Sequence, residues 1–242
     1  MNSYIERLKN RFVWKGIDGN GIYTTISIDN FAKETKKLNN IDFNKTADLY
    51  QKTKAVSEEY YNWCKQKLPY LKENELYNLK LHFIGCIGEF FFLKLFEHKN
   101  SLVISEKNKI YTFYNIRLRK IDETDFGVDL IGEVSPSTGG THKCVFQVKF
   151  WNPNSTESVI SNHICQIVHS DAIENDFINN SDDDNIFICW LGNMDQVSQW
   201  VVKNKLSRHI VFIDKDVLRK NIDKDLAFWN KLNTSFNEIE NW

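Results

Sequence analysis

Two stretches of the chain carry apolar residues at the spacing of a helix. Over residues 45–67 the apolar positions recur every three or four residues with charged residues between them, and Pro69 ends the pattern. A second helix is predicted over residues 74–97, with Asn74 as its N-cap. Its segment 83–96 is apolar almost all round, which indicates burial on most sides.

Short runs of β-branched and aromatic residues, bounded by turn signals, predict the strands. Two of these runs, 123–132 and 144–151, are separated by the Ser-, Pro- and Gly-rich loop 135–140 and are expected to form one hairpin. Further strands are predicted at 102–104, 110–118, 185–191 and 209–213. Helical patterns occupy 154–172, 194–203 and 218–232.

Strands that alternate with helices over the second half of the chain predict an α/β fold with a mixed sheet. Residues 71–242 are expected to form this core. Residues 1–70, with a hairpin predicted around the turn Asp18-Gly-Asn-Gly21 and the first helix, are expected to be a small N-terminal appendage.

Alternation along the predicted hairpin gathers polar groups on one patch. Gln147 and Lys149 point the same way and lie about 7 Å apart, while Cys144, Phe146, Val148 and Phe150 share the opposite face. On the partner strand Val128 and Leu130 are expected to face the core, and Asp129 to face away from it. A carboxylate, an amide oxygen and an ammonium group can therefore converge.

The order of these residues resembles the PD-(D/E)XK nuclease superfamily and, within it, the Mrr-like restriction endonucleases. The resemblance rests on Gly88-Glu89 in the second helix, the segment 125–129, and Gln147-Val-Lys149. It implies a restriction-endonuclease-like core, a mixed central sheet flanked by helices. The implied activity is metal-dependent hydrolysis of DNA, as the nuclease of a prokaryotic restriction or antiphage defence system.

The chemistry of phosphodiester hydrolysis gives each matched residue an expected role. Asp129 is the primary ligand for Mg²⁺ or Mn²⁺, and the Gln147 side-chain oxygen and the Val148 carbonyl add hard oxygen donors. Glu89 is expected to hold a water molecule beside the metal, and Lys149 to orient or activate the attacking water. Gln147 stands where Glu or Asp is commoner in the superfamily, so weaker metal binding is expected.

Three further side chains, Arg117, Arg119 and Gln166, are candidate substrate contacts, although exposed surface arginines are the commoner explanation of the first two. Asp125 is an accessory ligand or, by preference, shapes the turn with Gly127.

Charge and composition limit the partners. With 31 basic and 32 acidic residues the net charge is −1, so bulk charge does not attract DNA. A local groove, a metal, a homo-oligomer or a partner such as an ATPase or sensor subunit is therefore expected to present the DNA. No apolar run reaches the roughly 18 residues of a membrane span and no signal peptide is evident, so we expect no membrane contact and a cytoplasmic location. The five cysteines are expected to be reduced and buried.

Plainer alternatives remain beside this hypothesis. Glu89 can be neutralised by a single Lys or Arg, and Gln147-Val-Lys149 can be ordinary sheet surface. The chain can also be a non-catalytic nuclease-fold subunit that binds nucleic acid or assembles with a partner ATPase. Retention of Glu89, Asp129 and Lys149 together favours the enzyme, because such a subunit has no chemical need for all three.

Overall fold

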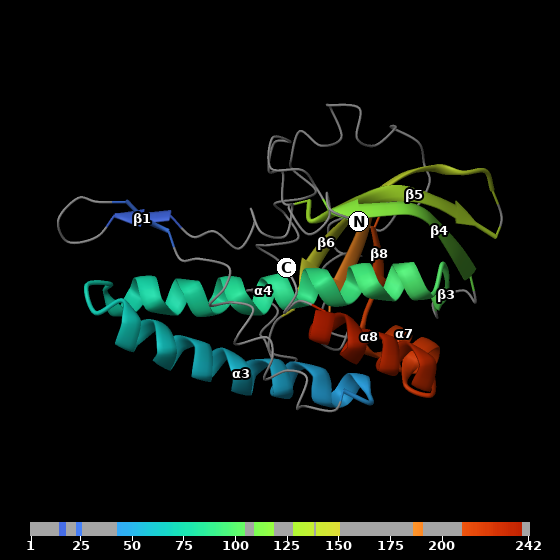
Figure 1. The fold of residues 1–242 in the computed structure, drawn as a ribbon. Coiled ribbons are helices and arrows are strands. Elements are labelled where there is room, and N and C mark those ends of the chain that lie inside the picture. Colours follow the sequence, from blue (N-terminus) through green and yellow to red (C-terminus); the bar gives the residue numbers. More distant parts are fainter. Residues whose placement is uncertain are drawn as a thin grey trace, which may run out of the picture.

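The computed structural model describes residues 15–17, 23–25, 43–104, 109–118, 128–137, 139–150, 186–190 and 210–238. Their helices are α3 (Thr46–Lys67), α4 (Glu73–His98), α7 (Lys215–Ile222) and α8 (Leu226–Glu238). Their strands are β1 (Lys15–Ile17), β2 (Tyr23–Thr25), β3 (Ser101–Ile104), β4 (Lys109–Leu118), β5 (Leu130–Pro136), β6 (His142–Lys149), β7 (Ile186–Trp190) and β8 (Ile210–Ile213) (Figure 1).

The main sheet has six strands in the order β3-β4-β5-β6-β7-β8. Strands β3 to β6 form an antiparallel meander, and β7 and β8 continue the sheet in parallel with β6. The predicted mixed α/β sheet and the β5–β6 hairpin are thus confirmed. Strands β1 and β2 pair separately and antiparallel, on either side of the predicted Asp-Gly-Asn-Gly turn.

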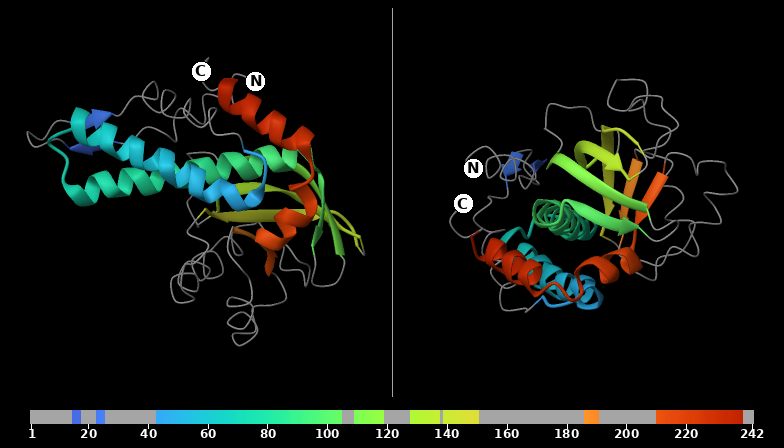
Figure 2. Two further views of the ribbon diagram at one scale, coloured as in Figure 1. Left: turned by 90° about the horizontal axis from the view of Figure 1, so that it is seen from below. Right: turned by 90° about the vertical axis from the view of Figure 1, so that its right-hand side faces the viewer.

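Helix α4 lies between the main sheet and the helices α3 and α8. Figure 1 and the right-hand view of Figure 2 place the main sheet on one side of α4, and α3 and α8 on the other. This position explains why the segment 83–96 has so few polar residues: ten of its apolar side chains, from Phe83 to Phe96, are buried. The prediction of a helix buried on most sides is confirmed.

One buried cluster connects all these layers. Phe146 of β6 lies 4.7 Å from Phe96 of α4 and stacks on Phe187 of β7 at 5.1 Å, measured between ring centroids. Helix α3 contributes Leu49, Val56 and other residues to the same cluster. The boundary predicted at residue 70 falls between two helices that share this cluster, and the division into appendage and core stays a prediction.

Asp223, between α7 and α8, closes the first turn of α3. Its Oδ1 accepts hydrogen bonds from the Thr46 backbone N–H at 2.9 Å and from the Thr46 hydroxyl at 2.6 Å. The N-cap of α3 is Lys45, whose side chain makes no capping bond. A residue 177 positions away therefore supplies the cap that the local sequence lacks.

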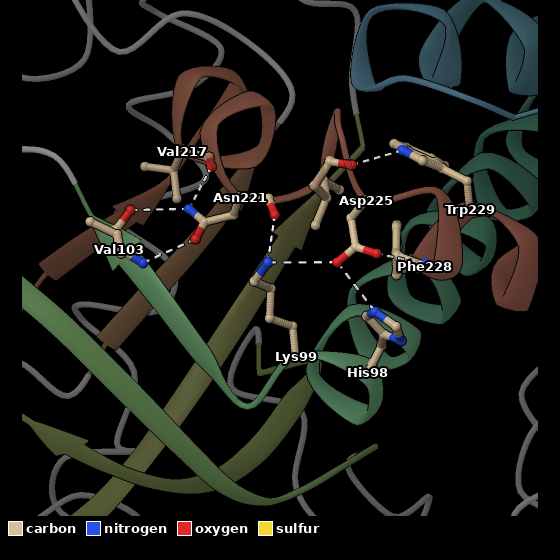
Figure 3. Close-up of polar contacts among 9 residues, drawn as sticks. His98, Lys99, Val103, Val217, Asn221, Asp225, Phe228 and Trp229 are labelled. Carbon is tan, nitrogen blue, oxygen red and sulfur yellow. Dashed lines mark hydrogen bonds and ion pairs between the residues drawn. The ribbon is translucent and has the colours of Figure 1, made fainter.

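A polar cluster ties the end of α4 to the C-terminal helices (Figure 3). The Asp225 carboxylate lies 3.3 Å from His98 Nε2 and 3.6 Å from Lys99 Nζ. Asn221 of α7 accepts a bond from the Val103 N–H and donates one to the Val103 carbonyl, at 3.1 and 3.0 Å. A side-chain amide thus pairs with the backbone of β3, an edge strand of the sheet.

Three element boundaries differ from the prediction. Strand β5 starts at Leu130 and runs through Pro136, so the strand predicted at 123–132 was placed too early; residues 119–127 lie outside the described residues. The helix predicted at 218–232 is two helices, because the Asp225 side chain accepts the Phe228 N–H and starts a new one. The N-cap of α4 is Lys72 rather than Asn74.

The helices predicted at 154–172 and 194–203 also lie outside the described residues. Of the cysteines, Cys64, Cys86, Cys144 and Cys189 are buried and free, as predicted, and Cys165 is not described. Among the helices that the structure describes, none combines the length and apolar character needed to cross a membrane.

Candidate functional site

The candidate site is built where the pairing of β5 and β6 becomes irregular. Leu130 pairs with Phe146, and the N–H of the preceding residue, Asp129, also donates to the Phe146 carbonyl, at 2.8 Å. The Asp129 carboxylate then accepts the Val148 N–H through Oδ2, at 2.7 Å. The Asp129 side chain, rather than a backbone carbonyl, thus accepts the hydrogen bond from this β6 residue. The bond brings Asp129 against the segment Gln147-Val-Lys149.

Side chains along β6 follow the predicted alternation. Cys144, Phe146, Val148 and Phe150 belong to the buried cluster on the α4 side of the sheet. Val145 and Gln147 are also buried but are not members of that cluster, and Lys149 is half-buried. Gln147 and Lys149 therefore share the face of β6 that points away from α4.

Gln147 is the unusual member of the set, because its side chain is fully buried. Within the described part of the chain, neither its Oε1 nor its Nε2 has a hydrogen-bond partner. A buried polar group left without a partner costs about 1–3 kcal/mol, and folded proteins rarely tolerate one without a reason. A ligand that accepts or donates at this amide would remove the cost.

Glu89 is on α4, in the layer that packs against the other side of the sheet. It is half-buried on α4 and follows Gly88, which lies so close to β6 that an added Cβ would stand 2.4 Å from the Phe150 Cβ. The helix approaches the strand this closely at Gly88 but not at Gly85, where an added Cβ would have nothing within 4 Å. Glu89 thus belongs to the helix on the Phe150 side of the sheet, whereas Gln147 and Lys149 belong to the other face.

Two buried thiols flank these residues. Burial raises the pKa of Cys189, which pairs with Val148 across the β6–β7 ladder, and the nearby charge of Asp129 raises it further. Burial also raises the pKa of Cys144, with Glu133 adding to the effect. Both groups stay protonated, so neither has the thiolate character of a nucleophile or a metal ligand.

The donors at the strand ends are oxygens rather than sulfur or imidazole. Among the described residues, no three or more His, Cys, Asp or Glu side chains gather as a metal site would require. Asp129, the unpartnered Gln147 amide and the Val148 carbonyl are nevertheless of the oxygen type that Mg²⁺ and Mn²⁺ bind. These oxygen donors are of the type that suits such an ion, and of the three only Asp129 carries a negative charge.

Of the candidate substrate contacts, only Arg117 can be placed. It is half-buried near the end of β4, and its Nη1 donates to the Leu118 carbonyl at 3.1 Å. Arg119, Gln166 and Asp125 lie outside the described residues. Sequence reasoning missed a register shift in β4 just before Arg117, whose one local signal is Asn115, a residue type that tolerates positive φ.

Comparison of the chain with protein-family models, with curated proteins and with solved structures gave no match.

Proposed function

We propose that this protein is a metal-dependent DNA endonuclease that serves a prokaryotic restriction or antiphage defence system. The observation that carries the proposal is the hydrogen bond from the Val148 N–H to the Asp129 carboxylate, in the middle of Gln147-Val-Lys149. Asp129, the residue before β5, and Val148, 19 positions later on β6, thereby meet in the order that resembles the PD-(D/E)XK nucleases.

The order of the elements supports the same proposal for the fold. Helix α4 with Gly88-Glu89 precedes the meander, Asp129 stands at the start of β5, and Gln147-Val-Lys149 ends the neighbouring strand β6. The glycine contact with Phe150 holds α4 against the end of β6, beside the proposed catalytic segment. A restriction-endonuclease-like core would need these three elements to be neighbours.

Each residue has a role that its chemistry permits. Asp129, the Gln147 side-chain oxygen and the Val148 carbonyl would hold Mg²⁺ or Mn²⁺, and the bound ion would supply charge relief at the scissile phosphate. Lys149 orients the attacking water and stabilises the negative charge that develops on the phosphate. Glu89, on the α4 side of the sheet, would hold a second water at the Phe150 end of β6 rather than bind the ion beside Gln147. Gln147 contributes no charge, so the ion is bound more weakly than by two carboxylates.

The test is cleavage of supercoiled and linear DNA with Mg²⁺, with Mn²⁺ and with a chelator. We expect the wild type to cut only with metal, and the variants Asp129→Ala and Lys149→Ala to lose cutting. Lys231→Ala is the control, since Lys231 is an exposed lysine on α8, away from the β6 face that carries Lys149. Cutting that survives in Asp129→Ala, or that is lost equally in Lys231→Ala, would contradict the assignment.

A second candidate function is a non-catalytic subunit that binds nucleic acid or assembles with a partner ATPase. It is favoured by the absence of a cluster of three acidic, His or Cys side chains in the described residues, and by the single negative charge among the proposed metal ligands. If it is correct, the wild type and Asp129→Ala bind DNA equally and neither cuts it with metal. Added partner ATPase or sensor subunit would then change assembly without eliciting cleavage.

A further inference from the structure

Strand β4 contains one more residue than its partner β5 over the same length. Tyr114 pairs with Glu133, but the next pair is Arg117 with Ile131, three residues on along β4 and two along β5. This is the count of a β-bulge, in which two residues of one strand stand opposite one of the other. The bulge therefore lies at Asn115 and Ile116.

The bulge changes which residues of β4 face α4. Tyr111 and Phe113 belong to the buried cluster on the α4 side, and regular alternation would send Arg117 to that side as well. Leu118 belongs to the cluster instead, and is 1 % exposed. The extra residue thus moves Arg117 out of the apolar core and onto the opposite face of the sheet.

Three residues build the bulge into the strand. Asn115 has a φ of 54°, in the left-handed region that asparagine tolerates better than most residues. Its Nδ2 donates to Glu133 Oε2 at 3.0 Å. Opposite lies Gly132, where an added Cβ would stand 2.2 Å from Ile116 Cδ1 and 3.0 Å from the Tyr114 carbonyl oxygen. A side chain at Gly132 would therefore collide with the bulge.

On this face of the sheet, only β5 lies between Arg117 on β4 and the proposed catalytic strand β6. Arg117 pairs with Ile131, and Ile131 pairs with Val145, so these three side chains form one row across β4, β5 and β6. Gln147 and Lys149 follow Val145 on the same face of β6. Two strand spacings separate the row's ends by about 10 Å, and Gln147 lies about 7 Å further along β6.

We propose that the bulge is a positioning device that presents Arg117 as a phosphate-binding residue on the face of the sheet that carries Gln147 and Lys149. The inference rests on the proposed nuclease function and names Arg117, at the β4 edge of this face, as the contact with the nucleic-acid backbone, because Val145 and Gln147 further across the face are fully buried. Arginine suits this role because its planar fork binds two phosphate oxygens at once and keeps its charge. Tyr114, three residues earlier on β4 and paired with Glu133, lies on the same face and is 42 % exposed.

The test measures binding of a fluorescent DNA duplex over a range of salt concentrations, with a chelator present so that nothing is cut. We expect Arg117→Gln to lower the association constant about tenfold and to reduce the slope of log K against log salt by about 1. Arg117→Lys should keep the slope and recover only part of the affinity, since it keeps the charge and loses the fork. Arg219→Gln, an exposed arginine on α7, is the control and should bind as the wild type does.

The bulge itself is tested by two substitutions at Asn115. Glycine accepts positive φ, so Asn115→Gly should bind DNA nearly as the wild type does, whereas Asn115→Val disfavours that conformation and should bind as weakly as Arg117→Gln. Thermal unfolding of each variant shows whether it is folded. Wild-type binding and cleavage together with unchanged binding by Arg117→Gln overturn this inference alone. A wild type that neither binds nor cuts DNA overturns the proposed function as well.

Discussion

Gly88 of α4 lies against Phe150 at the end of β6, where an added Cβ would stand 2.4 Å from the Phe150 Cβ. The backbone of α4 thus packs directly against the end of β6, the strand that carries Gln147 and Lys149. The ring of Phe150 continues this contact into the core, with its centroid 6.3 Å from that of Phe91. The position of α4 relative to the candidate site depends on this one missing side chain.

Gly88→Ala should therefore destabilise the protein, because Phe150 or the helix has to move. Overpacking of this kind costs about 1–3 kcal/mol. Gly85→Ala is the matched control on the same helix, because its Cβ meets nothing within 4 Å. Alanine has the higher helix propensity, so this variant should raise the free energy of unfolding by about 0.5–1 kcal/mol. Urea unfolding of both variants checks this, and equal stabilities would contradict the packing described here.

Asp223→Ala should remove the cap of α3 and lower the free energy of unfolding by about 1 kcal/mol. The reason is that Asp223 Oδ1 accepts both the Thr46 N–H and the Thr46 hydroxyl. Asp223→Asn keeps an acceptor oxygen and should retain most of the stability. Thermal unfolding compares the two variants, and a neutral Asp223→Ala would argue against the long-range cap.

The Asp214 carboxyl should contribute less to the stability of the fold at neutral pH than in mild acid. Burial raises the pKa of this N-cap carboxyl of α7, and the bonds from the Val217 and Asp216 N–H groups only partly oppose the shift. An acid with a raised native pKa binds its proton more tightly when folded, so stability falls as pH rises from the unfolded value of about 4 through the native pKa. Asp214→Asn keeps the cap without the charge.

We therefore expect Asp214→Asn to be as stable as the wild type or more stable at neutral pH, with any advantage vanishing below about pH 4. Asp214→Ala loses the cap and should be less stable at both pH values. Urea titrations at the two pH values measure this. An Asp214→Asn variant that is weakened at neutral pH only would show that the charge stabilises the fold.

Asp225 should have the opposite pH dependence. Burial alone raises its pKa, but the bonds from Phe228 N–H and His98, with the nearby charges of His98 and Lys99, lower it overall. Its contribution is therefore present above the unfolded pKa of about 4 and is lost as pH falls through the lower native pKa. Asp225→Asn should cost about 0.5–1 kcal/mol at neutral pH.

The difference between wild type and Asp225→Asn should then shrink in acid. Asp216→Asn, at an exposed carboxylate that faces Arg219 at 3.7 Å, is the control and should change stability little at any pH. A difference between wild type and Asp225→Asn that stays constant from neutral pH into acid would contradict the ion pairs drawn in Figure 3.

Sequence reasoning succeeded where the pattern is long or strongly periodic. The bounds of α3 and α4 were predicted to within about a residue, because each has several turns of regular spacing and a clear end. The alternation of β6 was also predictable, since a period of two fixes which side chains share a face. The hypothesis of a site at Gln147 and Lys149 depended on these two side chains sharing one face.

What the sequence did not predict depends on contacts between distant residues. The hydrogen bond from Thr46 to Asp223 joins residues 177 positions apart, so no local sequence pattern predicts it. The bulge in β4 is set by Gly132 of the next strand as much as by Asn115. The complete burial of Gln147 was also unexpected, because a glutamine between valines on a strand is typical of a half-solvated surface.

Under the proposed function, the Asp129 charge, held against β6, enables metal-dependent cleavage of DNA. The most direct test compares the DNA cleavage rate of wild type and Asp129→Asn over a Mg²⁺ titration. Asparagine can still accept the Val148 N–H, so the strand ends should stay in place while the one negative metal ligand disappears. We predict metal-dependent cutting by the wild type and its loss in a folded Asp129→Asn. Cutting by Asp129→Asn with the wild-type Mg²⁺ dependence would contradict the account.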